Sequence, residues 1–146
     1  MTYADSRIEI LLVEDNPGDV ELTRIAFREA KVPNPLRVVA DGMQAMAYLR
    51  QEPPFEHAIR PGLILLDLNL PRVDGREVLQ TVKSDPELRR IPVCVMSTSR
   101  QESDVRRSYD LHANSYISKP VTIAALIEIL AQLRNYWLRT VLLPSA

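Results

Sequence analysis

The chain has 146 residues, enough for one domain with its own buried core, and its 46% hydrophobic and 25% charged residues are globular averages. The formal net charge of -1 gives no electrostatic reason to expect nucleic acid or an anionic membrane as a partner. The single cysteine, Cys94, excludes an internal disulfide and a cysteine metal cluster, and we expect it to be a small buried hydrophobe.

The first half of the chain alternates short apolar runs with segments of helical spacing. These patterns predict a strand at 8–13, a helix reaching residue 31, a strand at 36–40 and a helix at 43–51. Prolines 53 and 54 break the last of these helices and open a loop that extends to Pro61.

The central apolar run ends in one carboxylate, Asp67, and the chain then turns at Pro71. A run that is apolar at consecutive positions is typical of a strand buried on both faces of a parallel sheet. The rest of the chain predicts a helix near 77–83, a strand at 91–96, a helix at 102–111, a strand at 115–118 and a final helix from 122. This alternation predicts one α/β domain with a doubly wound, five-stranded parallel sheet and helices on both faces.

Polar side chains stand where several of these strands end. Glu14 and Asp15 follow the first strand, Asp67 the third, Ser97 the fourth and Lys119 the fifth. Because ligands of open α/β sheets bind at the carboxyl ends of the strands, we expect these five groups to meet there.

Clustered carboxylates raise each other's pKa unless a cation is present, and an oxygen-only ligand set without His or Cys suits Mg²⁺. The backbone carbonyl of Asn69 is well placed to join that set. Beside Mg²⁺, an acidic side chain can attack a phosphoryl group and form an acyl phosphate. Lys119 and the Ser97 hydroxyl would then contact the phosphoryl oxygens.

The order and spacing of the motifs resemble the CheY-like receiver domain of two-component response regulators, from Ile8 to about Leu133. The matching segments are Leu12-Val13-Glu14-Asp15-Asn16, then Leu65 to Pro71 with Asp74-Gly75, then Met96-Ser97, and finally Tyr116-Ile117-Ser118-Lys119-Pro120. Asp-Gly or Lys-Pro alone would be weak signals. Ser97 stands where the family more often has threonine, which keeps the hydroxyl.

This resemblance implies a flavodoxin-like sheet of strand order 2-1-3-4-5 and a histidine kinase as phosphoryl donor. It further implies roles for individual residues: Asp67 as phosphoacceptor, Glu14, Asp15, Asp67 and the Asn69 carbonyl as Mg²⁺ ligands, Ser97 and Lys119 as phosphoryl contacts, Ser97 and Tyr116 as a coupled switch, and a cis peptide bond at Lys119–Pro120. Tyr116 would swing inward on activation.

Three further features narrow the resemblance to one subfamily of response regulators. The Glu14 to Asp19 motif, the insert from Pro53 to Pro61 and the apolar C-terminal end resemble the stand-alone regulators paired with phytochrome histidine kinases. We expect one receiver domain over 1–146, with a C-terminal extension over about 134–146 that forms a homodimer through Tyr136, Trp137 and Leu138. Folding back of that extension on its own domain is the alternative.

Two other functions remain open at this point. A phosphatase of the haloacid-dehalogenase type also uses an aspartate nucleophile and Mg²⁺, but Asn69 stands where its second aspartate would act as general acid and base. The other is a receiver-like scaffold that is never phosphorylated. We expect a signalling module rather than a metabolic enzyme. We expect it in the cytoplasm, because residues 1–7 carry no apolar signal region and no apolar run reaches the roughly 18 residues that span a bilayer. His57 and His112 are expected at the surface, away from the acidic edge.

Overall fold

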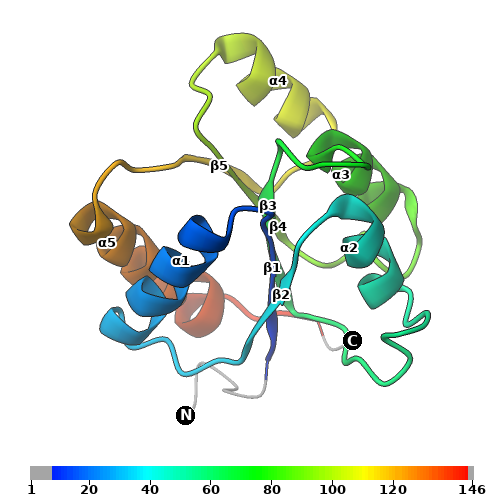
Figure 1. Cartoon of the computed structure of the whole chain (residues 1–146), viewed down its shortest axis with the longest axis horizontal. Helices are drawn as coiled ribbons and strands as arrows, with labels where there is room; N and C mark the ends of the chain where they lie inside the picture. Colours follow the sequence, from blue (N-terminus) through cyan, green and yellow to red (C-terminus); the bar gives the residue numbers. More distant parts are fainter. Residues whose placement is uncertain (1–7, 145–146) are drawn as a thin grey trace.

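Five short parallel strands form the centre of the computed structural model, in which residues 8–144 are described (Figure 1). The strands are β1 (Ile10–Val13), β2 (Leu36–Val39), β3 (Leu63–Asp67), β4 (Val93–Ser97) and β5 (Ser115–Ser118). They lie in the order β2-β1-β3-β4-β5, and every neighbouring pair is parallel. This confirms the predicted fold class and strand order.

Helices cover both faces of the sheet. They are α1 (Pro17–Glu29), α2 (Gly42–Leu49), α3 (Gly75–Ser84), α4 (Glu102–Asp110) and α5 (Ile123–Leu133). Figure 1 shows α1 and α5 together on one side of the strands and α2 and α3 on the other, with α4 beyond α3. Within residues 8–144, no helix is long and apolar enough to cross a membrane.

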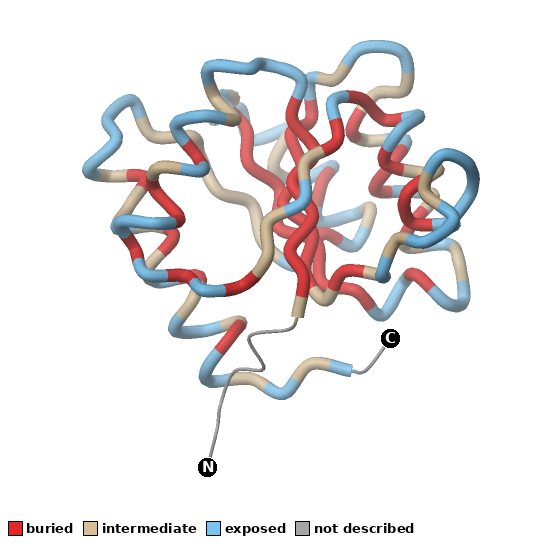
Figure 2. Tube along the Cα trace, turned by 60° about the horizontal axis from the view of Figure 1, so that its bottom comes forward, coloured by how far each residue is buried: buried red, intermediate tan, exposed pale blue. Residues whose placement is uncertain are grey.

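The sheet divides the core into two apolar clusters. Along β1, Ile10 and Leu12 face the cluster beneath α1 and α5, whereas Leu11 and Val13 face the cluster beneath α2 and α3. Figure 2 shows the buried positions concentrated along the central strands. Because both faces are covered, the strands need apolar residues at consecutive positions, which is the pattern that predicted them.

Side-chain caps begin the helices directly after the strands. Asn16, Asp41 and Thr122 each accept a hydrogen bond from a backbone N–H of the first turn of α1, α2 and α5. At the other end of α4, His112 adopts a left-handed backbone conformation with φ 71°. A left-handed residue often ends a helix, and this conformation costs free energy for any residue other than glycine. His112 is exposed, as expected, and it marks the end of α4.

The first part of the C-terminal extension is helical and continues α5 as the segment η1 (Arg134–Thr140). Leu138 is only 1% exposed and belongs to the core cluster beneath α1 and α5, against which the half-buried Trp137 also packs. The expectation that Leu138 lies on a dimer surface is therefore wrong: burying this leucine against its own domain removes its apolar surface from water without a second copy. Tyr136 is 55% exposed. Residues 1–7 and 145–146, the outermost parts of the expected domain and extension, lie outside the described residues.

The expected cis bond at Lys119–Pro120 is not present. Among residues 8–144, the one cis peptide bond joins Pro53 and Pro54. The trans form of a bond before proline is intrinsically favoured by about 0.5–1 kcal/mol. With the Lys119–Pro120 bond trans, the backbone N–H of Lys119 still donates to the Ser97 carbonyl at 2.8 Å.

Candidate functional site

The strand register brings the predicted site residues to one edge of the sheet. Asp67 is the last residue of β3, and Val13 pairs with Leu66, so Glu14 follows β1 at the level of Asp67. Lys119 follows β5, and its backbone N–H donates to the carbonyl of Ser97, the last residue of β4. The chain therefore exits each of these strands at the same place.

The ammonium group of Lys119 joins three carboxylates. Its Nζ donates to Glu14 Oε1 at 2.6 Å, to Asp67 Oδ2 at 3.2 Å and to Asp19 Oδ2 at 3.4 Å. Glu14 is 4% and Asp67 8% exposed, so two of these carboxylates are largely removed from water. Buried charges need such partners, because an unpaired one would cost several kcal/mol.

The carboxylate of Asp67 is held at both oxygens. Oδ2 accepts from Lys119, and Oδ1 accepts from the backbone N–H of Asn69 at 3.1 Å. Behind it, α3 begins in close contact with the strand: a Cβ atom added to Gly75 would lie 2.3 Å from the Asp67 carbonyl oxygen. Only glycine fits there, and this packing fixes the backbone that presents the carboxylate.

Burial and charge perturb two groups of the site. Burial and the neighbouring Asp67 carboxylate raise the pKa of Glu14 to about 7, although Lys119 acts in the opposite direction. Burial by itself would lower the pKa of Lys119, but the hydrogen bond and the charge of Glu14, together with Asp67, raise it. Lys119 is therefore a permanent cation beside two acidic groups.

Three carboxylates at this edge could hold a divalent cation. Glu14, Asp15 and Asp67 each offer one oxygen, and the three atoms lie within 4.8 Å of one another. Asp15 is exposed, so the cluster opens to solvent on that side. Carboxylate oxygens without nitrogen or sulfur ligands fit a hard cation such as Mg²⁺, Mn²⁺ or Ca²⁺. The role of the Asn69 carbonyl as a further ligand stays a prediction.

The two expected switch residues lie on neighbouring strands. Ser97 is buried, and its Oγ accepts from the backbone N–H of Ser99 at 3.1 Å. Tyr116 packs against the core cluster beneath α2 and α3, and its hydroxyl donates to the Ser99 carbonyl at 2.8 Å. Their coupling on activation stays a prediction.

Sequence reasoning missed two contributors near this edge. In the sequence, Asp19 is only the last residue of the Glu14 to Asp19 motif, yet it reaches Lys119 because it lies in the first turn of a helix that begins at the strand ends. The second is Asp104 of α4, which binds both Ser99 and Arg76. Contacts between separate elements leave no local pattern in a sequence.

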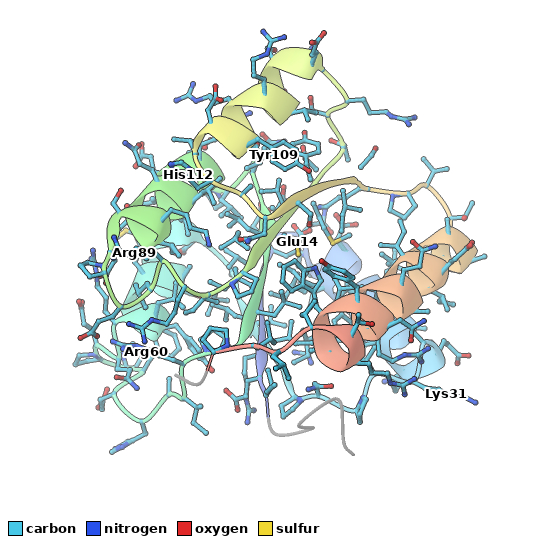
Figure 3. All side chains as sticks on the ribbon, turned by 180° about the vertical axis from the view of Figure 1, so that it is seen from behind. Glu14, Lys31, Arg60, Arg89, Tyr109 and His112 are labelled. Carbon is cyan, nitrogen blue, oxygen red and sulfur yellow. The ribbon has the colours of Figure 1, made fainter. Side chains whose placement is uncertain are left out.

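Figure 3 shows Glu14 among the central elements and His112 at the end of α4, as expected for a surface histidine.

A cavity of about 90 Å³ opens beside the site between α1 and the start of α5. Glu14, Asp67 and Lys119 form its polar end, and apolar side chains that include Leu22 and Val121 form the rest. Leu22 and Val121 are themselves exposed. The charged groups are thus accessible from an apolar rim.

Comparisons with known proteins agree with this geometry. The family model for the response regulator receiver domain matches residues 10–131. The response regulator Rcp1 of Synechocystis sp. is 45% identical over 137 residues, which cover 94% of this chain and 93% of that protein.

Two solved structures are also closely similar. The phosphorylated cyanobacterial phytochrome response regulator RcpA superposes with a TM-score of 0.89 at 52% identity, covering 95% of this chain and 99% of that one. The Mn²⁺-bound form of Rcp1 superposes with a TM-score of 0.87 at 44% identity, covering 94% and 99%. The strand order 2-1-3-4-5 and the acidic strand-end cluster bridged by Lys119 agree with the family match over residues 10–131. This chain belongs to the response regulator receiver family.

Proposed function

We propose that this protein accepts a phosphoryl group from a histidine kinase on Asp67 and passes the signal on through altered contacts with a partner. The observation that carries the proposal is the bridge from Lys119 Nζ to both Glu14 and Asp67 at the carboxyl ends of the strands. This contact supports the proposal because a carboxylate that could act as a nucleophile, a fixed cation and further acidic groups lie together at one open edge. Receiver-domain proteins are signalling proteins, and this assignment keeps the chain in that class.

The chemistry assigned to Asp67 is phosphoryl transfer. One carboxylate oxygen attacks the phosphorus of the donor phosphohistidine, an O–P bond forms, and the P–N bond breaks with its electron pair returning to the imidazole. The hydrogen bonds from Lys119 and the Asn69 N–H orient the carboxylate before attack. Lys119 then neutralises negative charge on the phosphoryl oxygens, which is the main requirement of this reaction.

We assign the divalent cation to Glu14, Asp15 and Asp67, with the Asn69 carbonyl as a further ligand, and propose Mg²⁺ as that cation. When bound, it supplies positive charge that offsets repulsion between the carboxylates and the incoming phosphoryl group. Ser97 would donate its hydroxyl to a phosphoryl oxygen. Glu14 and Asp67 are buried and Asp15 is exposed, so a cation could reach the three carboxylates from the solvent side.

The donor is proposed to be a phytochrome-type histidine kinase. Rcp1 and RcpA share 44–52% identity with this chain, and RcpA is described as a phytochrome response regulator. The exposed apolar side chains of Leu22 and Val121, beside the acidic edge, would form part of the surface that contacts the kinase. We place the encounter in the cytoplasm.

Phosphotransfer from a kinase tests this proposal. An autophosphorylated bacteriophytochrome kinase, labelled on its phosphohistidine, is mixed with the native chain, with Asp67→Asn and with Glu77→Gln, which removes an exposed acid on α3. We expect label to move to the native chain and to Glu77→Gln but not to Asp67→Asn. Transfer to Asp67→Asn at the native rate would contradict the proposal.

We further propose that the receiver spans 1–146 and self-associates through the outer side of its C-terminal extension. Tyr136 is 55% exposed and Leu142 is 96% exposed, whereas Leu138 packs into the core of its own domain. Sedimentation should show a dimer that Tyr136→Ser combined with Leu142→Ser dissociates. A native chain that remains a monomer at high concentration would contradict this surface.

A further inference from the structure

A chain of side-chain contacts connects α3 and α4 to the loop that follows β4. Arg76, in the first turn of α3, donates from Nη2 to Asp104 Oδ1 at 3.0 Å. The other oxygen of Asp104 accepts from the Ser99 hydroxyl at 2.6 Å. Asp104 therefore holds one residue of the loop and one residue of a neighbouring helix at the same time.

The same loop residue carries the contact of Tyr116. The Tyr116 hydroxyl donates to the backbone carbonyl of Ser99 at 2.8 Å, and the Ser99 N–H donates to Ser97 Oγ at 3.1 Å. The side chain of Ser99 thus points to Asp104 while its backbone joins Ser97 and Tyr116. Without Asp104, the Ser99 hydroxyl would keep only the 3.3 Å hydrogen bond from the backbone N–H of Gln101, so the peptide that presents the carbonyl to Tyr116 would be held less firmly.

Asp104 is held in turn by fixed partners. Arg76 is only 21% exposed at its side chain and is anchored to the capping residue of α3, because its backbone N–H donates to Asp74 Oδ1 at 2.7 Å. The Ser99 hydroxyl and the Arg76 guanidinium together lower the pKa of Asp104, so it is ionised at neutral pH. Hydrogen bonds to an ionised acceptor are shorter and stronger than neutral ones.

A second ion pair on the same helix lacks this connection. Glu102 accepts from Arg106 at 2.7 Å, four residues along α4, and both side chains are largely exposed. Glu102 and Asp104 both lie in the first turn of α4, so each has the same interaction with the helix dipole. Only Asp104 reaches the loop.

We propose that Asp104 is a positioning residue that holds the Ser99 carbonyl where the Tyr116 hydroxyl docks. It would thereby favour the half-buried, docked position of the Tyr116 ring, here called inward, before any phosphoryl group arrives. The inference rests on the proposed function only in its consequence for Asp67. A receiver whose inward state is already populated binds a phosphoryl group more tightly, since the apparent dissociation constant is divided by the competent fraction.

The position of the Tyr116 ring in the ligand-free protein is the direct test. The chain is labelled with 3-fluorotyrosine, the Tyr116 signal is assigned with Tyr116→Phe, and its exposure is read from the fluorine shift between H₂O and D₂O. We expect Asp104→Ala and Ser99→Ala to lower the inward-to-outward ratio by about tenfold, the lower end for a hydrogen bond to a charged group. Glu102→Ala should leave the signal unchanged.

A ring signal that stays native in Asp104→Ala, or that moves equally in Glu102→Ala, would overturn the inference. Neither result depends on phosphorylation. A role of Asp104 in stability alone would lower the melting temperature of Asp104→Ala and leave the ring signal where it was.

Beryllofluoride binding with Mg²⁺ tests the consequence. We expect Asp104→Ala to weaken binding by up to about tenfold in the native background and to have no effect in the Tyr116→Phe background, because Asp104 acts through Tyr116. Equal weakening in both backgrounds would overturn this route. A native chain that binds no beryllofluoride would contradict the proposed function, while the fluorine signal would still decide the role of Asp104.

Discussion

Glu14 makes the stability of the metal-free protein depend on pH in an unusual direction. Its pKa is raised from 4.5 to about 7, first by burial, and Asp67 adds to that increase. The folded protein therefore holds a proton on Glu14 over a pH range in which the unfolded chain has lost it. Stability contributed by that proton is complete below the unfolded pKa and is lost as pH rises through the folded pKa.

The size of the effect follows from the two pKa values. The whole shift corresponds to about 3 kcal/mol at 1.36 kcal/mol for each pKa unit. Between about pH 5.5 and about pH 8, the free energy of unfolding should fall by about 2 kcal/mol, because the folded state releases its proton within that window and the unfolded state does not. Glu14→Gln has no proton to lose and should lack this component.

Urea unfolding in EDTA at the two pH values measures the component as the difference between the native chain and Glu14→Gln. Titrating groups that do not interact with Glu14 contribute equally in both proteins and cancel. Saturating Mg²⁺ should reverse the trend, since a bound cation favours the ionised carboxylate. A native chain that loses no more stability than Glu14→Gln on raising the pH would refute the assignment of Glu14 as a buried, proton-holding carboxylate.

Three other predictions concern packing. Gly75→Ala should lower the free energy of unfolding by more than about 1 kcal/mol in urea, because the added Cβ would lie 2.3 Å from the Asp67 carbonyl oxygen; a neutral result would contradict that contact. His112→Gly should raise the melting temperature through a gain of about 1 kcal/mol, because His112 has φ 71°, and a loss of stability by calorimetry would mean that its side chain matters more than its backbone. Leu138→Ala should cost about 2–5 kcal/mol in urea without changing the sedimentation coefficient, and dissociation of a dimer with unchanged stability would show the opposite arrangement.

The fold and the central acidic edge could be predicted because their signals are local. A strand buried on both faces requires consecutive apolar residues, so Leu63 to Leu66 identify the central strand and Asp67 its end. Parallel strands exit at a common edge, which is why Glu14 and Lys119 could be expected to meet although they are far apart in sequence.

The C-terminal segment and the loop after β4 could not be predicted in the same way. The leucines and the tryptophan beyond Arg134 fit equally well on a dimer surface and against the chain's own core, and only the packed structure places Leu138 inside. Asp104 likewise has the sequence signature of an ordinary helix N-terminal acid. Its contacts with Ser99 and Arg76 depend on how α3 and α4 approach each other.

Intact mass after incubation with acetyl phosphate tests the central assignment most directly. The native chain, Asp67→Asn and Lys119→Met are compared, each with Mg²⁺ and with EDTA. We expect one added phosphoryl group on the native chain with Mg²⁺, none with EDTA and none on Asp67→Asn. Addition to Lys119→Met should be strongly reduced, because the buried charge that orients Asp67 is lost. Addition of the same mass to Asp67→Asn as to the native chain would contradict that assignment.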